Sequence, residues 1–384
     1  MKNIKKYLPY LTLFVLLPIL SCSSNKYSPN DITGNYYLPP IAKVGEGAYL
    51  KGGLVYDLDN KPVPQCHAST IVETPSGLVT AFFAGTGEAH PDVGIWVSRL
   101  ENDSWTWPVE VVNGFEHDTL RYPTWNPVFF QPENGPLMLF YKVGPGPQTW
   151  WGMLITSDDD GRTWSTPRKL GEDEQVGDLL GPIKNKPVQL LDGTIISPTS
   201  IEYPVGDIPE QDWRVYFEIS SDMGKTWEVI PPINDGVGFD AIQPSILTYP
   251  DGRLQVICRT RQGVLSQSWS SDQGRTWSEM TALGLPNPNS GTDAVTLQDG
   301  RQLLIYNHST KSGEEPKGRN ILNLALSDDG ENWIPVMTLE NDPIEDGYAY
   351  PAIIQSFDGL VHITYTYNRV SIKYVLIDPA KLKI

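Results

Sequence analysis

The sequence is short of basic residues, of histidine and of cysteine, and each shortage narrows the range of functions. It has 29 Lys and Arg against 46 Asp and Glu, a formal net charge of −17. A protein that binds nucleic acid needs a basic surface to neutralise phosphates, so we expect no nucleic-acid partner. An acidic small substrate is not excluded, because a local basic pocket can lie within an acidic surface.

Long apolar runs are also missing, apart from one in the N-terminal segment. Residues 1–21 combine three lysines, the run YLPYLTLFVLLPIL and small residues after it, which is typical of a signal peptide. Cys22 has the place of the lipidated cysteine of bacterial lipoproteins, and residues 22–46 would form a tether. An ordinary signal peptide with an incidental cysteine is the alternative. We expect export to the bacterial cell envelope, at its periplasmic or outer-membrane face, with membrane contact only through the lipid anchor.

The chain has only two other cysteines, and no metal-binding motif. Cys66 and Cys258 could form a disulfide in an oxidising compartment, or remain two buried thiols. The acidic run SDDDG at 157–161 lacks the alternating ligand spacing and the closing Glu of a calcium loop. We therefore expect neither a metal nor another cofactor.

Repeated motifs are the strongest signal in the chain. The pattern S-x-D-x-G-x-T-W is complete at 157–164, 220–227 and 270–277, is partly kept at 326–333 (Asp328, Gly330 and Trp333), and is degenerate around Trp105. Ser and Asp can cap backbone N–H groups in a turn and Gly allows a positive φ, so we give this motif a structural role. A strand–turn–strand unit recurs six times, with turn glycines Gly77, Gly135, Gly193, Gly252, Gly300 and Gly359.

Six such units predict an all-β fold, a six-bladed β-propeller of four-stranded blades over residues 47–384. The strands are rich in β-branched and aromatic residues and are bounded by Gly, Asp and Pro. The last unit lacks its fourth strand, whereas residues 47–57 have no unit of their own. We expect this segment to supply the missing outer strand and to close the ring, leaving no open sheet edge. The protein is expected to be a monomer.

These Asp-box (BNR) repeats on six blades resemble the sialidase (neuraminidase) superfamily, and the resemblance covers residues 47–384. It implies three arginines that hold a substrate carboxylate, a tyrosine nucleophile activated by a glutamate, and an aspartate on a loop as acid/base. This is a known exception to the two-carboxylate scheme of glycosidases. Indexed to the turn glycines, the resemblance assigns the nucleophile to Tyr350 and two of the arginines to Arg259 and Arg319.

Three positions depart from the pattern. Gln243 stands in place of the activating glutamate, His67 in place of the first arginine, and Thr366 in place of the glutamate that supports this arginine. A glutamine cannot take up a proton, so the superfamily mechanism cannot operate unchanged. Histidine titrates near neutrality, and His67 would suit a general base or acid. Alternatively, it caps backbone groups at the mouth of its strand.

Other residues are expected around the pocket. The loop GTGEAHPDVGIW offers Asp92 as the acid/base, with Glu88 and His90 as rivals, or is simply a solvated loop. Trp150 and Trp151 could stack on a sugar or be packed in the core. Residues near the mouths of inner strands are expected to line the pocket: Trp125, Asn126, Lys184, Lys186 and Asp293.

The sequence therefore predicts an exported sialidase-like glycoside hydrolase that acts on a terminal acidic sugar of a glycan. In this hypothesis Arg259 and Arg319 bind the carboxylate, Tyr350 lies at the anomeric carbon, and His67 and Asp92 handle protons. One alternative is a uronate-directed polysaccharide lyase with His67 as base and Tyr350 as acid. The other is a non-catalytic glycan-binding lipoprotein in which Gln243 marks a lost activity.

Overall fold

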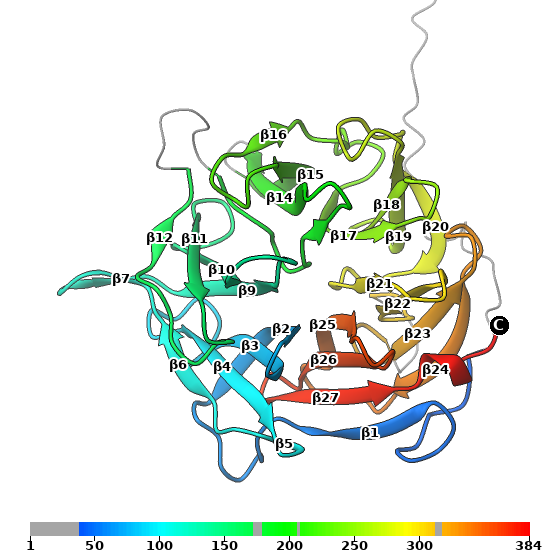
Figure 1. Ribbon diagram of the computed structural model, residues 1–384, viewed down its shortest axis with the longest axis horizontal. Coiled ribbons are helices and arrows are strands. Elements are labelled where there is room, and N and C mark those ends of the chain that lie inside the picture. The colour runs from blue at the N-terminus through cyan, green and yellow to red at the C-terminus, as the bar shows by residue number, and fades with distance from the viewer. Residues whose placement is uncertain (1–37, 172–178, 206–207, 312–316) are drawn as a thin grey trace, which may run out of the picture.

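Six antiparallel sheets surround a central axis like the blades of a propeller (Figure 1). The computed structural model describes residues 38–171, 179–205, 208–311 and 317–384. Within these residues the only helix is the 3-10 helix η2 (Pro379–Lys381). Its three residues are too few to span a membrane. The predicted all-β, six-bladed fold is confirmed. The predicted signal peptide and Cys22 lie outside the described residues.

Each blade is built from strands that follow one another along the chain. Blade 1 contains β2 (Gln65–Thr74), β3 (Gly77–Gly85), β4 (Gly94–Glu101), β5 (Ser104–Trp105) and β6 (Val109–Val112). Blade 2 contains β9 (Thr124–Phe130), β10 (Leu137–Val143), β11 (Trp151–Ser157) and β12 (Arg168–Lys169). Blade 3 contains β13 (Val188–Gln189), β14 (Ile195–Val205), β15 (Ile208–Ser220) and β16 (Glu228–Ile230).

The other three blades repeat this order. Blade 4 contains β17 (Ala241–Thr248), β18 (Leu254–Thr260), β19 (Val264–Ser270) and β20 (Thr281–Pro286). Blade 5 contains β21 (Asp293–Thr296), β22 (Gln302–Tyr306), β23 (Leu322–Ser327) and β24 (Ile334–Glu340). Blade 6 contains β25 (Tyr348–Gln355), β26 (Val361–Tyr367), β27 (Ser371–Ile377) and β1 (Tyr49–Leu54), and a small ribbon of β7 (Phe115–His117) and β8 (Leu120–Arg121) stands apart.

The ring is closed by the N-terminal strand, as the sequence predicts. Strand β1 pairs antiparallel with β27, with Leu54 opposite Lys373. The last residues of the expected tether also contact the propeller, because the Ala42 amide donates to the Thr338 carbonyl and the Thr338 hydroxyl donates to the Pro39 carbonyl. Both contacts tie the segment before β1 to blade 5.

The core lies between neighbouring blades. Strands β9 and β10 are buried at every residue, because one face of each packs against blade 1 and the other against blade 3. Cys66 and Cys258 are buried free thiols in this packing. In the part of the chain that the structure describes, no group of three or more His, Cys, Asp or Glu side chains is placed to hold a metal ion.

The Asp-box loops are held by the same local contacts in successive blades. In blade 2 the Ser157 hydroxyl accepts a hydrogen bond from the Gly161 amide (2.8 Å), and the Asp159 carboxylate accepts one from the Thr163 amide (2.7 Å). Blades 3 and 4 repeat these contacts. In blade 5 the capping carboxylate is that of Asp329, not Asp328, because this copy of the loop is one residue shorter.

Candidate functional site

The inner strands share a backbone irregularity that defines the candidate site. Nine residues before the turn glycine, five of the six blades carry a residue with a positive φ: Ala68 (56°), Asn126 (35°), Lys184 (71°), Gln243 (58°) and Tyr350 (51°). Strand pairing shifts register beside four of these positions, which marks β-bulges. Such φ values are costly for residues other than glycine and cluster at functional sites. We call these positions the inner column.

Tyr350 lies at the centre of the residues that the resemblance assigns. Its phenolic oxygen accepts hydrogen bonds from Arg259 Nη1 (2.9 Å) and Gln243 Nε2 (3.2 Å). The guanidinium carbons of Arg259 and Arg319 lie 5.9 and 5.5 Å from its ring centroid. Arg259 is held in turn by Asn289, whose side-chain oxygen accepts from Nε at 2.7 Å. Four residues chosen by sequence register from blades 4, 5 and 6 are therefore neighbours in space.

His67 lies behind Tyr350, away from solvent. It is 2% exposed, its Nδ1 is 3.0 Å from the Thr366 hydroxyl, and its ring centroid is 4.3 Å from that of Tyr350. Burial, followed by the charges of nearby cations including Arg369, lowers the pKa of His67 well below its usual value. The histidine is therefore neutral near pH 7 and cannot serve as an acid there. The two residues that replace an arginine–glutamate pair, His67 and Thr366, contact each other.

A small cavity opens beside Tyr350 and carries two carboxylates. Its lining comes from loops and strands of blades 1, 2, 3, 4 and 6: Glu88, Trp125, Asn126, Pro147, Trp150, Ile183, Ser200, Glu202, Ile242, Gln243 and Tyr350. Trp125, Asn126 and Trp150 are thus among the lining residues. Trp151 is not part of this lining and packs edge-on against Tyr122 instead.

Glu202 is a site residue that the sequence analysis missed. It lies in β14, and the Trp213 indole donates a hydrogen bond to its Oε2 at 3.2 Å. Burial raises the pKa of Glu202, although Arg259 and the Trp213 hydrogen bond oppose the shift. A carboxyl with a raised pKa beside a cavity is a general-acid candidate. Glu202 lies in the second strand of blade 3, as Arg259 lies in the second strand of blade 4. The signal in the sequence is therefore a charged residue near the end of a second strand.

A third arginine also escaped the sequence analysis. Arg369, in the turn between β26 and β27, pairs with Glu88 at 2.6 Å. Its charge contributes to the lowered pKa of His67, which places the guanidinium in the electrostatic environment of the site. The site therefore gathers Arg259, Arg319 and Arg369, the last from a turn instead of the expected inner strand.

Asp92 does not line the cavity, whereas its rival Glu88 does. The Asp92 carboxylate accepts hydrogen bonds from the Thr86 amide (3.0 Å) and hydroxyl (2.6 Å), and lies 2.7 Å from His90 Nδ1. Slight burial alone would raise its pKa, but these hydrogen bonds outweigh that effect and hold the pKa below its usual range. Asp92 therefore shapes its own loop, and its environment does not suit an acid.

Lys186 and Asp293 are bound to each other beneath the site. Their side chains are 3.0 Å apart, and Asp293 also accepts hydrogen bonds from the Ser245 hydroxyl and the Ile353 amide. Lys184 donates to the carbonyl of Thr292, and burial lowers its pKa to about 7. None of the three charged residues lines the cavity, so their contacts join blades instead of facing it.

The fold and this cluster define a six-bladed Asp-box propeller with a tyrosine between arginines. The chain matches the BNR repeat-like domain model over residues 76–363, and it belongs to that family and to the sialidase superfamily. It is 26% identical over 161 residues to the anhydrosialidase of Macrobdella decora (39% of this chain, 21% of the relative). It is 28% identical over 198 residues to a sialidase of Bacteroides fragilis strain YCH46 (48% and 33%).

The chain thus matches a fifth to a third of the length of these two curated relatives. Among solved structures, the Hadza microbial sialidase Hz136 superposes with a TM-score of 0.69 at 21% identity, covering 86% of this chain and 69% of that one. This structural likeness shows the shared fold. Together, the matches support a divergent, sialidase-like member of this superfamily.

Proposed function

We propose that the protein is an exported glycoside hydrolase that releases a terminal acidic sugar from a glycan. The observation that carries the proposal is the pair of hydrogen bonds from Arg259 and Gln243 to the phenolic oxygen of Tyr350. Two donors, one of them charged, stabilise negative charge on this oxygen. A negatively charged oxygen at the anomeric carbon would stabilise the oxocarbenium-like transition state of glycoside cleavage.

The three arginines supply the binding half of the reaction. A guanidinium group donates two parallel hydrogen bonds to a carboxylate, so Arg259 and Arg319 would hold the sugar carboxylate over Tyr350. Arg369 would complete the set when the substrate carboxylate competes with Glu88 for it. Because these cations already surround a buried site, an anionic sugar replaces repulsion between them with attraction.

Glu202 would supply the proton chemistry. As an acid it donates its proton to the departing glycosidic oxygen while the bond to the anomeric carbon breaks. A water molecule then adds to that carbon and returns a proton to Glu202, so that atoms and charge balance. Glu88, ion-paired with Arg369, is the second carboxylate at the cavity. His67 is a positioning residue that supports the Tyr350 ring.

The test is a digestion screen of glycans that end in acidic sugars, with wild type and Tyr350→Phe. We expect wild type to release the acidic sugar and the variant to lose this activity. Tyr249→Phe is the matched control, because Tyr249 directly follows β17, at the end of this strand away from Gln243, and its hydroxyl donates to Gln255. Equal release by wild type and Tyr350→Phe would contradict the proposal.

One observation favours a second candidate, a lyase acting beside a uronate carboxylate. The neutral His67 packs against Tyr350, and arginines lie nearby. In a lyase, His67 would be the base, Tyr350 the acid and the arginines the charge-neutralising groups. A lyase leaves a conjugated double bond in its product, and a hydrolase does not. Ultraviolet absorbance that rises with digestion would therefore favour the lyase over the hydrolase.

A further inference from the structure

The Asp-box loops do more than close hairpins, because each one packs against the preceding blade. In blade 1, Arg99 Nη1 donates to the carbonyl of Asp160 in the box of blade 2. In blade 4, Gln255 donates to the carbonyl of Gly330 in the box of blade 5, at 2.7 Å. The Met138 side chain of blade 2 lies beside the box glycine of blade 3. A box loop thus fills the gap between two neighbouring blades.

Blade 1 lacks this loop, and its box region is a tight two-residue hairpin. Asn102 and Asp103 have φ values of 50° and 65°, and Glu101 pairs directly with Ser104. A left-handed backbone conformation at both turn residues is typical of a type I′ hairpin. Trp105 stands in the box tryptophan position, yet among the described residues its indole N–H has no hydrogen-bond partner. In blades 3, 4 and 5 this N–H donates to the carbonyl of the box glycine, whereas the N–H of Trp164 in blade 2 also has no partner among the described residues.

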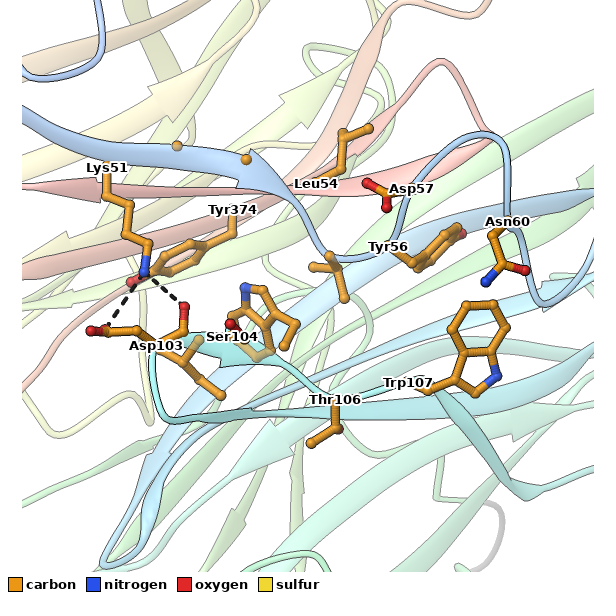
Figure 2. A pocket seen from close by; sticks show the side chains of 15 residues that line it. Lys51, Leu54, Tyr56, Asp57, Asn60, Asp103, Ser104, Thr106, Trp107 and Tyr374 are labelled. Carbon is orange, nitrogen blue, oxygen red and sulfur yellow. Dashed lines mark hydrogen bonds and ion pairs between the residues drawn. The ribbon is translucent and has the colours of Figure 1, made fainter.

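The missing loop leaves a cavity of about 440 Å³ between blades 6 and 1. Strand β1 forms one wall and the hairpin of β4 and β5 the other (Figure 2). At one end Lys51 pairs with Asp103 (3.6 Å), and at the other end Trp107 lies below Asn60 (Figure 2). The cavity shares no lining residue with the cavity beside Tyr350.

We propose that this interblade cavity is an accessory binding site for a neutral sugar residue of a glycan. The Trp107 side chain is 49% exposed, and an exposed indole beside polar groups offers an apolar face to the C–H groups of a pyranose. Asn60 and Asp57 line the same end and present amide and carboxylate groups to sugar hydroxyls. The volume lies within the range of small-molecule sites.

The charges of the lining favour a neutral sugar over other ligands. Lys51 is already paired with Asp103, which leaves the Asp57 carboxylate as the remaining charge of the lining. An acidic sugar would be repelled by this carboxylate. A quaternary ammonium ion prefers a cage of several aromatic faces, whereas Trp105 and Tyr374 pack edge to face against each other (5.3 Å). A neutral, hydroxyl-rich ring fits both the aromatic face and the polar end.

The experiment is a titration of the protein with neutral monosaccharides, followed by ligand-observed NMR and calorimetry. The probes are galactose, glucose, fucose and N-acetylglucosamine, with tetramethylammonium as the cationic probe. Trp107→Ala removes the aromatic face. Gly53→Leu places a side chain on the strand face that Lys51 uses, where a Cβ meets no atom within 4 Å. Phe357→Ala, at a 94% exposed aromatic outside the cavity, is the matched control.

We expect at least one neutral sugar to bind wild type and Phe357→Ala equally, with a loss of about tenfold or more in both cavity variants. Turnover of small acidic substrates should stay unchanged in all of them, because no cavity residue belongs to the Tyr350 site. The proposal is overturned if no neutral sugar binds, if binding survives both cavity variants, or if only tetramethylammonium binds.

Discussion

The inner column and the Asp-box loops both recur around the ring, but different features are conserved between the copies of each. The box loops repeat residues together with their contacts, so that Ser157 and Ser220 each accept the amide of their box glycine at 2.8 Å. The inner column repeats only a backbone geometry, with Ala68, Lys184 and Tyr350 at equivalent positions. The box side chains thus hold the loops of blades 2 to 5, whereas the inner column leaves its side chains free to differ and to do chemistry.

The largest effect on activity is expected from Tyr350→Phe, at the inner column. Removing the phenolic oxygen leaves Arg259 and Gln243 without their acceptor. We expect kcat to fall by at least about 10²-fold, the scale of losing one electrostatic stabiliser of a transition state. Thermal melting should change little, since the ring and its contact with His67 remain. If Tyr350→Phe lowered the melting temperature but left kcat unchanged, the residue would act on stability, as the box residues do, and the contrast between the two regions would be wrong.

An effect of similar size is expected from Glu202→Gln. It keeps the shape of the side chain but removes the proton that Glu202 would donate, and we expect kcat to fall by about 10²–10⁴-fold. Because burial raises the pKa of Glu202, the wild-type rate should decline as pH rises through that pKa and the acid loses its proton. A pH–rate profile checks this. An unchanged alkaline limb in the variant would show that another group is the acid.

Arg369→Ala should act mainly on substrate binding. One charge-assisted contact to a carboxylate would be lost, so we expect KM to rise by about 10- to 100-fold with a smaller change in kcat. Steady-state kinetics with an acidic-sugar substrate separate the two constants. Glu88→Gln, which frees Arg369 from its ion pair, is the matched control and should not raise KM.

The smallest effect on activity is expected from Asp272→Ala in the blade 4 box. The Thr276 amide and hydroxyl would lose their acceptor, and the protein should lose about 0.5–2 kcal/mol of stability, the scale of a lost cap. Activity per folded molecule should remain. Chemical denaturation and active-site titration measure the two quantities separately.

The carboxylates of the Asp-box loops also predict how the stability of the protein depends on pH. Hydrogen bonds from Thr226 lower the pKa of Asp222 to about 2, below its unfolded value. The stabilisation is therefore present above the unfolded pKa of about 4 and is lost as pH falls toward 2. The melting temperature of wild type should fall over this range, and less steeply in a variant with Asp222→Asn. An equal slope in both proteins would contradict this link.

The architecture can be predicted from the sequence because the turn glycine motif occurs once in each blade. The number of copies gives the number of blades, and the position of each copy gives the register of its strands. That register also predicts that Tyr350, Gln243, Arg259 and Arg319 lie together, since each position is fixed within its blade by the motifs of that blade. Arg369, by contrast, comes from a turn, where no repeat fixes the position. Glu202 lies in a strand whose end the resemblance did not mark. Asp92 was misleading because a loop sequence does not reveal that its hydrogen bonds close the loop itself.

The most direct test of the central claim is digestion of an acidic-sugar glycan in water enriched in heavy oxygen, with mass spectrometry of the released sugar. Hydrolysis at a Tyr350–arginine site predicts one heavy oxygen in the released acidic sugar, with no release by Tyr350→Phe. An unsaturated product without heavy oxygen, or labelled sugar released equally by Tyr350→Phe, would contradict it.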